Sequence, residues 1–124
     1  MAKTILIADD DKKSIKLLRD VLQASGYFVA VARDGRETVA LAQARKPDLI
    51  LMDIRMPVMD GIAAMKKLRA DPNTDRIPII AITAHAMRGN KERFIQQGFD
   101  DFLAKPVDIH VLLDRVRLHL HEEG

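Results

Sequence analysis

The chain has 124 residues, contains no cysteine and carries a formal net charge of +2, from 20 Lys and Arg against 18 Asp and Glu. This length fits one domain with a substantial core, and the lack of cysteine excludes a disulfide framework and a thiolate metal site. No apolar run reaches the length of a signal-peptide core or a membrane span, so we expect a cytoplasmic protein with no membrane segment. The basic residues are spread along the chain, which disfavours direct nucleic-acid binding.

Five short apolar runs predict the strands of a sheet. The first, third and fourth runs are nearly continuous, which is typical of parallel strands buried on both faces. The second and fifth runs are more mixed, as expected of edge strands. In chain order, the runs cover residues 4–8, 27–32, 49–52, 79–82 and 102–104.

Stretches with helical periodicity follow each of these runs. Residues that stop or start helices punctuate them, in the order Gly26, Pro47, Asp71-Pro72-Asn73, Gly98 and Asp108. Strand and helix therefore alternate five times, without a linker or an internal repeat. We predict one α/β domain over residues 1–124, built on a doubly wound parallel sheet.

Polar residues that could carry chemistry stand where the apolar runs stop. Asp9 and Asp10 follow the first run, Asp53 the third, Thr83 the fourth and Lys105 the fifth. Each residue alone could be a cap, a strand residue or a turn residue. Parallel strands all end at the same edge of a sheet, however, and ligands bind in the crevice outside those ends. Their joint occurrence therefore predicts one site.

The three carboxylates indicate the chemistry of this site. Carboxylates brought together repel one another and are tolerated chiefly around a cation. Mg²⁺ fits best, because Ca²⁺ requires more oxygen ligands and Zn²⁺ prefers nitrogen or sulfur. A carboxylate beside such an ion can attack phosphorus, and Asp53 is the best candidate because it ends the most buried run. Lys105 and Thr83 would supply a cation and a hydroxyl to the phosphoryl oxygens.

Four segments carry a family resemblance: ILIADDD (5–11), PDLILMDIRMPVMDG (47–61), PIIAITA (78–84) and KP (105–106). Through them the chain resembles the receiver domain of two-component response regulators over essentially its whole length. The resemblance implies a flavodoxin-like (βα)5 fold with strand order 2-1-3-4-5. It also implies Mg²⁺-dependent phosphoryl transfer from the phosphohistidine of a histidine kinase or histidine phosphotransfer protein to Asp53. Such a receiver is a signalling phosphoacceptor that catalyses its own phosphorylation and slow autodephosphorylation.

The same resemblance assigns roles around the metal and the phosphoryl group. It implies that Asp10, Asp53 and the backbone carbonyl of Arg55 hold Mg²⁺, while Asp9 helps through water. Thr83 and Lys105 would grip the phosphoryl oxygens, and the peptide bond after Lys105 is expected to be cis.

A switch and two partner surfaces are also implied by the resemblance. Thr83 and Phe102 occupy the switch positions, and because Phe102 lacks a hydroxyl we expect its ring to face inward even before phosphorylation. The downstream protein partner would bind the face made by the fourth helix, fifth strand and fifth helix. Contact with a partner protein is also expected around the first helix, near Ser14 and Leu17.

Several alternatives stay open at this stage. A small Mg²⁺-dependent phosphohydrolase with an aspartyl-phosphate intermediate is one, although such enzymes generally place the nucleophile after the first strand. A flavin-binding module is another, although the acidic first loop would repel a phosphate. His85 could tune hydrolysis of the aspartyl phosphate or have no role, and His119 is expected to interact with the end of its helix. The domain could be a stand-alone regulator or part of a larger protein.

Overall fold

The computed structural model describes residues 2–84 and 90–122, in which strands and helices alternate along the chain. The five strands form one parallel sheet in the order β2-β1-β3-β4-β5, which confirms the predicted fold class. The strands are β1 Thr4–Ala8, β2 Phe28–Ala32, β3 Leu49–Asp53, β4 Ile79–Thr83 and β5 Asp101–Ala104. The helices are α1 Lys12–Ala24, α2 Gly35–Arg45, α3 Gly61–Arg69, α4 Asn90–Gln97 and α5 Ile109–His119.

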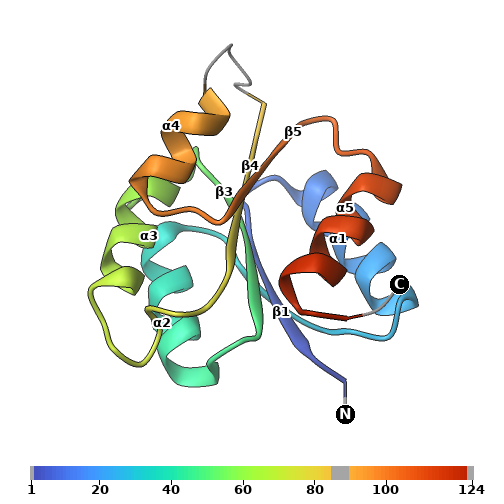
Figure 1. The fold of residues 1–124 in the computed structure, drawn as a ribbon, viewed down its shortest axis with the longest axis horizontal. Coiled ribbons are helices and arrows are strands. Elements are labelled where there is room, and N and C mark those ends of the chain that lie inside the picture. Colours follow the sequence, from blue (N-terminus) through green and yellow to red (C-terminus); the bar gives the residue numbers. More distant parts are fainter. Residues whose placement is uncertain (1, 85–89, 123–124) are drawn as a thin grey trace.

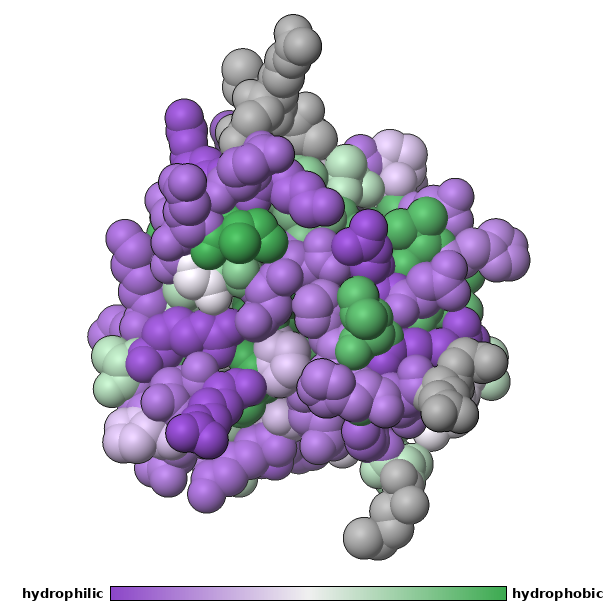
Figure 2. Space-filling model, viewed as in Figure 1, coloured by the Kyte–Doolittle hydropathy of each residue, from purple (hydrophilic) through white to green (hydrophobic). Residues whose placement is uncertain are grey.

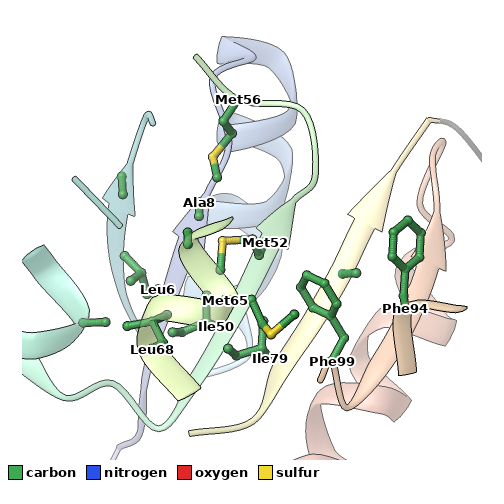
Figure 3. Packing of buried hydrophobic residues seen from close by; sticks show 14 residues of the cluster. Leu6, Ala8, Ile50, Met52, Met56, Met65, Leu68, Ile79, Phe94 and Phe99 are labelled. Carbon is green, nitrogen blue, oxygen red and sulfur yellow. The ribbon is translucent and has the colours of Figure 1, made fainter. Parts of the chain in front are cut away.

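Helices cover both faces of the sheet (Figure 1). Helices α2, α3 and α4 lie on one face, and α1 and α5 lie on the other. Alternate residues of each central strand therefore enter two different cores: Leu6 and Ile50 pack under α3, whereas Ile5 and Leu51 pack under α1 and α5. Figure 3 shows the first of these cores, in which Met65 lies among the side chains of β3 and β4. Burial on both faces explains the continuous apolar runs.

The two edge strands are less buried than the three central ones. The side chain of Phe28 at the start of β2 is 65% exposed, and β5 combines buried and exposed residues. By contrast, every residue of β3 and β4 is buried. The mixed composition of the second and fifth runs thus corresponds to their places at the sheet edges.

Aspartate caps start four of the helices at the edge where the strands end. Asp11, Asp34, Asp60 and Asp108 each accept hydrogen bonds from backbone N–H groups of the first helical turn. Such a cap contributes about 1 kcal/mol and satisfies an otherwise unpaired donor. Asp108 confirms the cap predicted for the fifth helix.

Two strands extend one residue further than their apolar runs. Asp53 pairs with Ile82 across β3 and β4, and Thr83 pairs with Ala104 across β4 and β5. The ladder is made by backbone groups, so it continues through a polar residue whose side chain leaves the core. As a result, both candidate site residues are carried by regular strands rather than by loops.

Candidate functional site

Three aspartates lie together at the carboxyl ends of β1 and β3. One carboxylate oxygen from each of Asp9, Asp10 and Asp53 lies within 4.8 Å of the others. The strand pairing that sets Ala8 beside Met52 brings the ends of these two strands together. Asp9 and Asp53 are buried, with 2% and 8% exposure, whereas Asp10 faces solvent. The cluster therefore combines two buried carboxylates with one exposed carboxylate.

Lys105 neutralises part of this charge. Its Nζ atom lies 2.9 Å from Oδ2 of Asp9 and 3.0 Å from Oδ2 of Asp53. The lysine follows β5, and its backbone N–H donates to the carbonyl of Thr83 at 2.9 Å. The following Lys105–Pro106 peptide bond is cis, as the sequence resemblance implied. One lysine thus serves two of the three carboxylates.

The second oxygen of each buried aspartate accepts from the backbone. The N–H of Asp11 donates to Oδ1 of Asp9 at 2.9 Å, and the N–H of Arg55 donates to Oδ1 of Asp53 at 3.2 Å. Each carboxylate is therefore held between a backbone donor and the Lys105 ammonium. This arrangement fixes the carboxylate orientation before any ligand arrives.

Burial and charge act in opposite directions on the ionisation of this pair. Burial raises the pKa of Asp53 above its ordinary value, Lys105 opposes the shift, and the Asp9 carboxylate adds to it. Burial lowers the pKa of Lys105, but the hydrogen bonds and charges of Asp9 and Asp53 outweigh it, so the net shift is upward. The site holds its lysine charged and retains an excess of negative charge, which an additional cation would relieve.

Thr83 lies at the end of β4, one residue beyond the partner of Asp53. It is buried and lines a cavity of about 240 Å³ together with Arg55 and Phe94. The half-buried ring of Phe102 stacks on Phe94, with ring centroids 5.4 Å apart. An inward orientation of Phe102 remains a prediction, and His85 lies outside the described residues.

Asp101 is a buried, ion-paired residue that the sequence analysis does not identify. It is 3% exposed, and its carboxylate contacts Arg115 Nη1 at 3.1 Å and His119 Nε2 at 2.8 Å. Its Oδ1 atom also accepts from the N–H of Phe102. His119 lies in the last turn of α5, where an interaction with the helix end is expected, and it also contacts this strand residue. The available signal was the spacing of Arg115 and His119, which places both on one side of α5.

Comparisons with known proteins identify the family of this chain. The sequence model of the response regulator receiver domain matches residues 5–117. The chain belongs to the response regulator receiver family. This membership favours a signalling receiver over the phosphohydrolase and the flavin-binding module considered from the sequence.

Individual receivers are similar along nearly the full chain. The polar-differentiation response regulator DivK of Brucella anthropi is 38% identical over 120 residues, which cover 97% of this chain and 98% of DivK. The Francisella response regulator 1452 receiver domain has a TM-score of 0.89 and 34% identity, covering 96% of this chain and 97% of that one. The receiver domain of sensor histidine kinase PA1611 from Pseudomonas aeruginosa, with magnesium in its active-site cleft, has a TM-score of 0.90 and 35% identity. That comparison covers 98% of this chain and 100% of the PA1611 domain.

No helix in the described part of this receiver is long and apolar enough to cross a bilayer.

Proposed function

We propose that this receiver accepts a phosphoryl group on Asp53 from the phosphohistidine of a histidine kinase or a histidine phosphotransfer protein. The observation that carries the proposal is the buried Asp53 carboxylate, held by Lys105 beside two further aspartates. A purely structural role gives no reason to keep three carboxylates within 4.8 Å of one another. Signalling then follows from the new charge on Asp53.

The donor chemistry of the cluster fits Mg²⁺. The cluster offers carboxylate oxygens from Asp9, Asp10 and Asp53, which are the ligands that a hard divalent cation prefers. Among the described residues, the exposed Asp10 carboxylate has no hydrogen-bond donor. In the proposed site, Asp10, Asp53 and the backbone carbonyl of Arg55 would hold the ion, and Asp9 would help through water. When bound, Mg²⁺ would neutralise charge on the transferring phosphoryl group.

The residues of the chain itself perform the transfer. An Asp53 carboxylate oxygen attacks phosphorus, an O–P bond forms, and the electron pair of the breaking N–P bond returns to the imidazole of the donor. Lys105 lies 3.0 Å from the Asp53 carboxylate, and in the proposal it binds a phosphoryl oxygen. Thr83, at the end of the neighbouring strand, supplies a hydroxyl to a second oxygen.

The proposed donor docks on α1 beside the site. A cavity of about 200 Å³ lies between α1 and the segment that follows β5, and it is lined by Ser14, Leu17 and Pro106 among others. The Leu17 side chain is 44% exposed although it is apolar. A donor helix seated here would bring its histidine toward Asp53, because Lys105 lines the same cavity.

The proposed location remains the cytoplasm, as expected from the sequence.

The proposed output face consists of α4, β5 and α5. Apolar side chains of Ile95, Val111 and Leu118 on these two helices are 41%, 40% and 60% exposed. Figure 2 shows that apolar patches of this kind are separated by hydrophilic surface on the face in view. In the proposal, Thr83 moves toward the phosphoryl group and Phe102 repacks, which changes this face for a downstream protein.

Intact-protein mass after incubation with acetyl phosphate tests the phosphoacceptor. We expect a gain of one phosphoryl group that requires Mg²⁺ and is lost in base, and no gain for Asp53→Asn. Asp48→Asn is the matched control, because Asp48 lies just before the opposite end of β3 and caps the N–H of Thr4 there. Failure of the wild-type protein to gain mass, even from a phosphorylated histidine donor, would contradict the proposal. Steady turnover of a phosphate ester would favour the phosphohydrolase.

A further inference from the structure

The first turn of α2 lies so close to the loop after Asp53 that residue 35 has no room for a side chain. A Cβ atom built on Gly35 would lie 2.0 Å from the carbonyl oxygen of Met59 and 2.6 Å from its carbonyl carbon. Both are backbone atoms, so no side-chain rotation can relieve the overlap. Any residue other than glycine must push the loop that joins β3 to α3 away from α2.

The two ends of that loop are hydrogen-bonded to Asp53 and to Ile54, the residue that follows it. The N–H of Arg55 donates to Oδ1 of Asp53, and the N–H of Gly61 donates to the carbonyl of Ile54 at 2.8 Å. A Cβ on Gly61 would lie 2.3 Å from the backbone oxygen of Asp53, so the end of the loop at Gly61 packs against the backbone of Asp53. Displacement of the loop therefore changes the surroundings of the Asp53 carboxylate.

The shape of the loop also depends on its surroundings. Val58 has a φ of 68° although it is β-branched, and its side chain is 75% exposed. Such a left-handed conformation is costly and persists only where neighbouring structure imposes it. The N–H of Met59 donates to the carbonyl of Pro57 at 2.7 Å, which ties the turn at that point. On the α2 side, the loop is supported by the close approach of Met59 to Gly35.

We propose that Gly35 is a positioning residue, which sets the place of the Asp53 carboxylate and of the adjacent Arg55 backbone by letting the loop seat on α2. The metal-binding part of this inference rests on the proposed function. Through this contact, α2 influences the position of Asp53 although α2 belongs to neither the proposed output face nor the proposed donor-docking surface.

The test compares Gly35→Ala with Gly26→Ala. Both add one methyl group at a helix boundary, but a Cβ on Gly26 meets nothing within 4 Å. The φ of 94° at Gly26 makes alanine strained there, so this control loses stability without touching the loop. Amide NMR spectra of the metal-free proteins, followed by a Mg²⁺ titration, report on the loop and on affinity. We expect Gly35→Ala to shift the amide resonances of Asp53 and Arg55 and to raise the Mg²⁺ Kd at least tenfold. Gly26→Ala should leave those two resonances unchanged and the Kd within twofold of wild type.

Unchanged amide shifts and Kd in folded Gly35→Ala would overturn the inference, as would equal changes in both variants. If Gly35→Ala does not fold, Met59→Ala is the second variant: it keeps the atoms that face Gly35 but removes the side chain that packs this part of the loop on the core. That variant should shift the amides of Asp53 and Arg55 and weaken Mg²⁺ binding at least threefold, and an unchanged spectrum contradicts the dependence of the Asp53 site on the seating of the loop. If wild-type protein binds no Mg²⁺, the proposed function fails, whereas the metal-free amide shifts still decide the positioning role.

Discussion

The Nζ atom of Lys105 lies 3.0 Å from Oδ2 of Asp53, and it lies 2.9 Å from Oδ2 of Asp9 as well. A single ammonium therefore holds two buried carboxylates, one just after β1 and one at the end of β3. In the described part of the chain, no other Lys, Arg or His forms an ion pair with either aspartate. The charge balance of the site thus depends on this lysine until another cation binds.

Lys105→Met should destabilise the metal-free protein by about 2 kcal/mol, because it leaves Asp9 and Asp53 close together without a counter-charge. The size reflects nearly full burial of the Asp9 side chain and 18% exposure of the lysine. Urea unfolding with and without Mg²⁺ provides the measurement. Added Mg²⁺ should stabilise the variant more than the wild type, and equal metal-free stabilities would contradict this electrostatic account.

Asp10→Ala should have the opposite effect on the metal-free protein. Asp10 is exposed and lies within 4.8 Å of two other carboxylates, so its removal relieves repulsion without opening a cavity. We expect an unchanged or slightly higher free energy of unfolding, together with a Mg²⁺ Kd raised by about tenfold or more, equivalent to about 1.4 kcal/mol. Calorimetric titration and urea unfolding measure the two quantities. A clear loss of metal-free stability would show that Asp10 supports the fold instead.

The fold was accessible from the sequence because local pattern and tertiary burial agree in the central strands. Continuous apolar runs at 49–52 and 79–82 reflect burial on both faces, and polar residues mark where those strands leave the core. The positions of Asp53 and Thr83 at one sheet edge follow from parallel topology. The apolar runs predict the ends of β3 and β4 one residue short, because backbone pairing does not depend on side-chain polarity.

The contacts that escaped prediction connect separate elements of the fold. Burial of Asp101 depends on how α5 docks against the edge strand β5, and nothing local in a polar Asp-Asp pair indicates that docking. Gly35 follows a cap residue and resembles an ordinary turn glycine in the sequence. The need for glycine at this position comes from its contact with Met59 in the loop before α3. Such packing constraints arise only after the elements have assembled.

Asp101→Asn should lose about 2 kcal/mol of stability near pH 7, because Arg115 and His119 lose a buried partner. Burial raises the pKa of Asp101, but His119, the Phe102 N–H and Arg115 outweigh it, so the net shift is below the usual value of 3.8. A depressed folded pKa gives stability that is present above pH about 4 and is lost as pH falls through the folded value. Urea unfolding of both proteins from pH 7 to pH 3 should therefore show their difference shrinking in acid. A pH-independent difference would contradict the ionised form of Asp101.

Tyr27 should ionise well above the usual range for tyrosine, and its absorbance can be followed alone because the chain has one Tyr and no Trp. Burial first, and then the hydrogen bond from its hydroxyl to Glu122 Oε1 at 2.6 Å, raise its pKa from 10.0 to about 12. A raised folded pKa stabilises the protein below the unfolded value, and this contribution disappears as pH rises from about 10 to about 12. Tyrosinate absorbance near 295 nm during alkaline titration should show a midpoint close to 12 while the fold persists. Glu122→Gln should move that midpoint part of the way toward 10, since burial of the ring remains. A wild-type midpoint near 10 in the folded protein would show that the end of the chain does not hold Tyr27 in this contact.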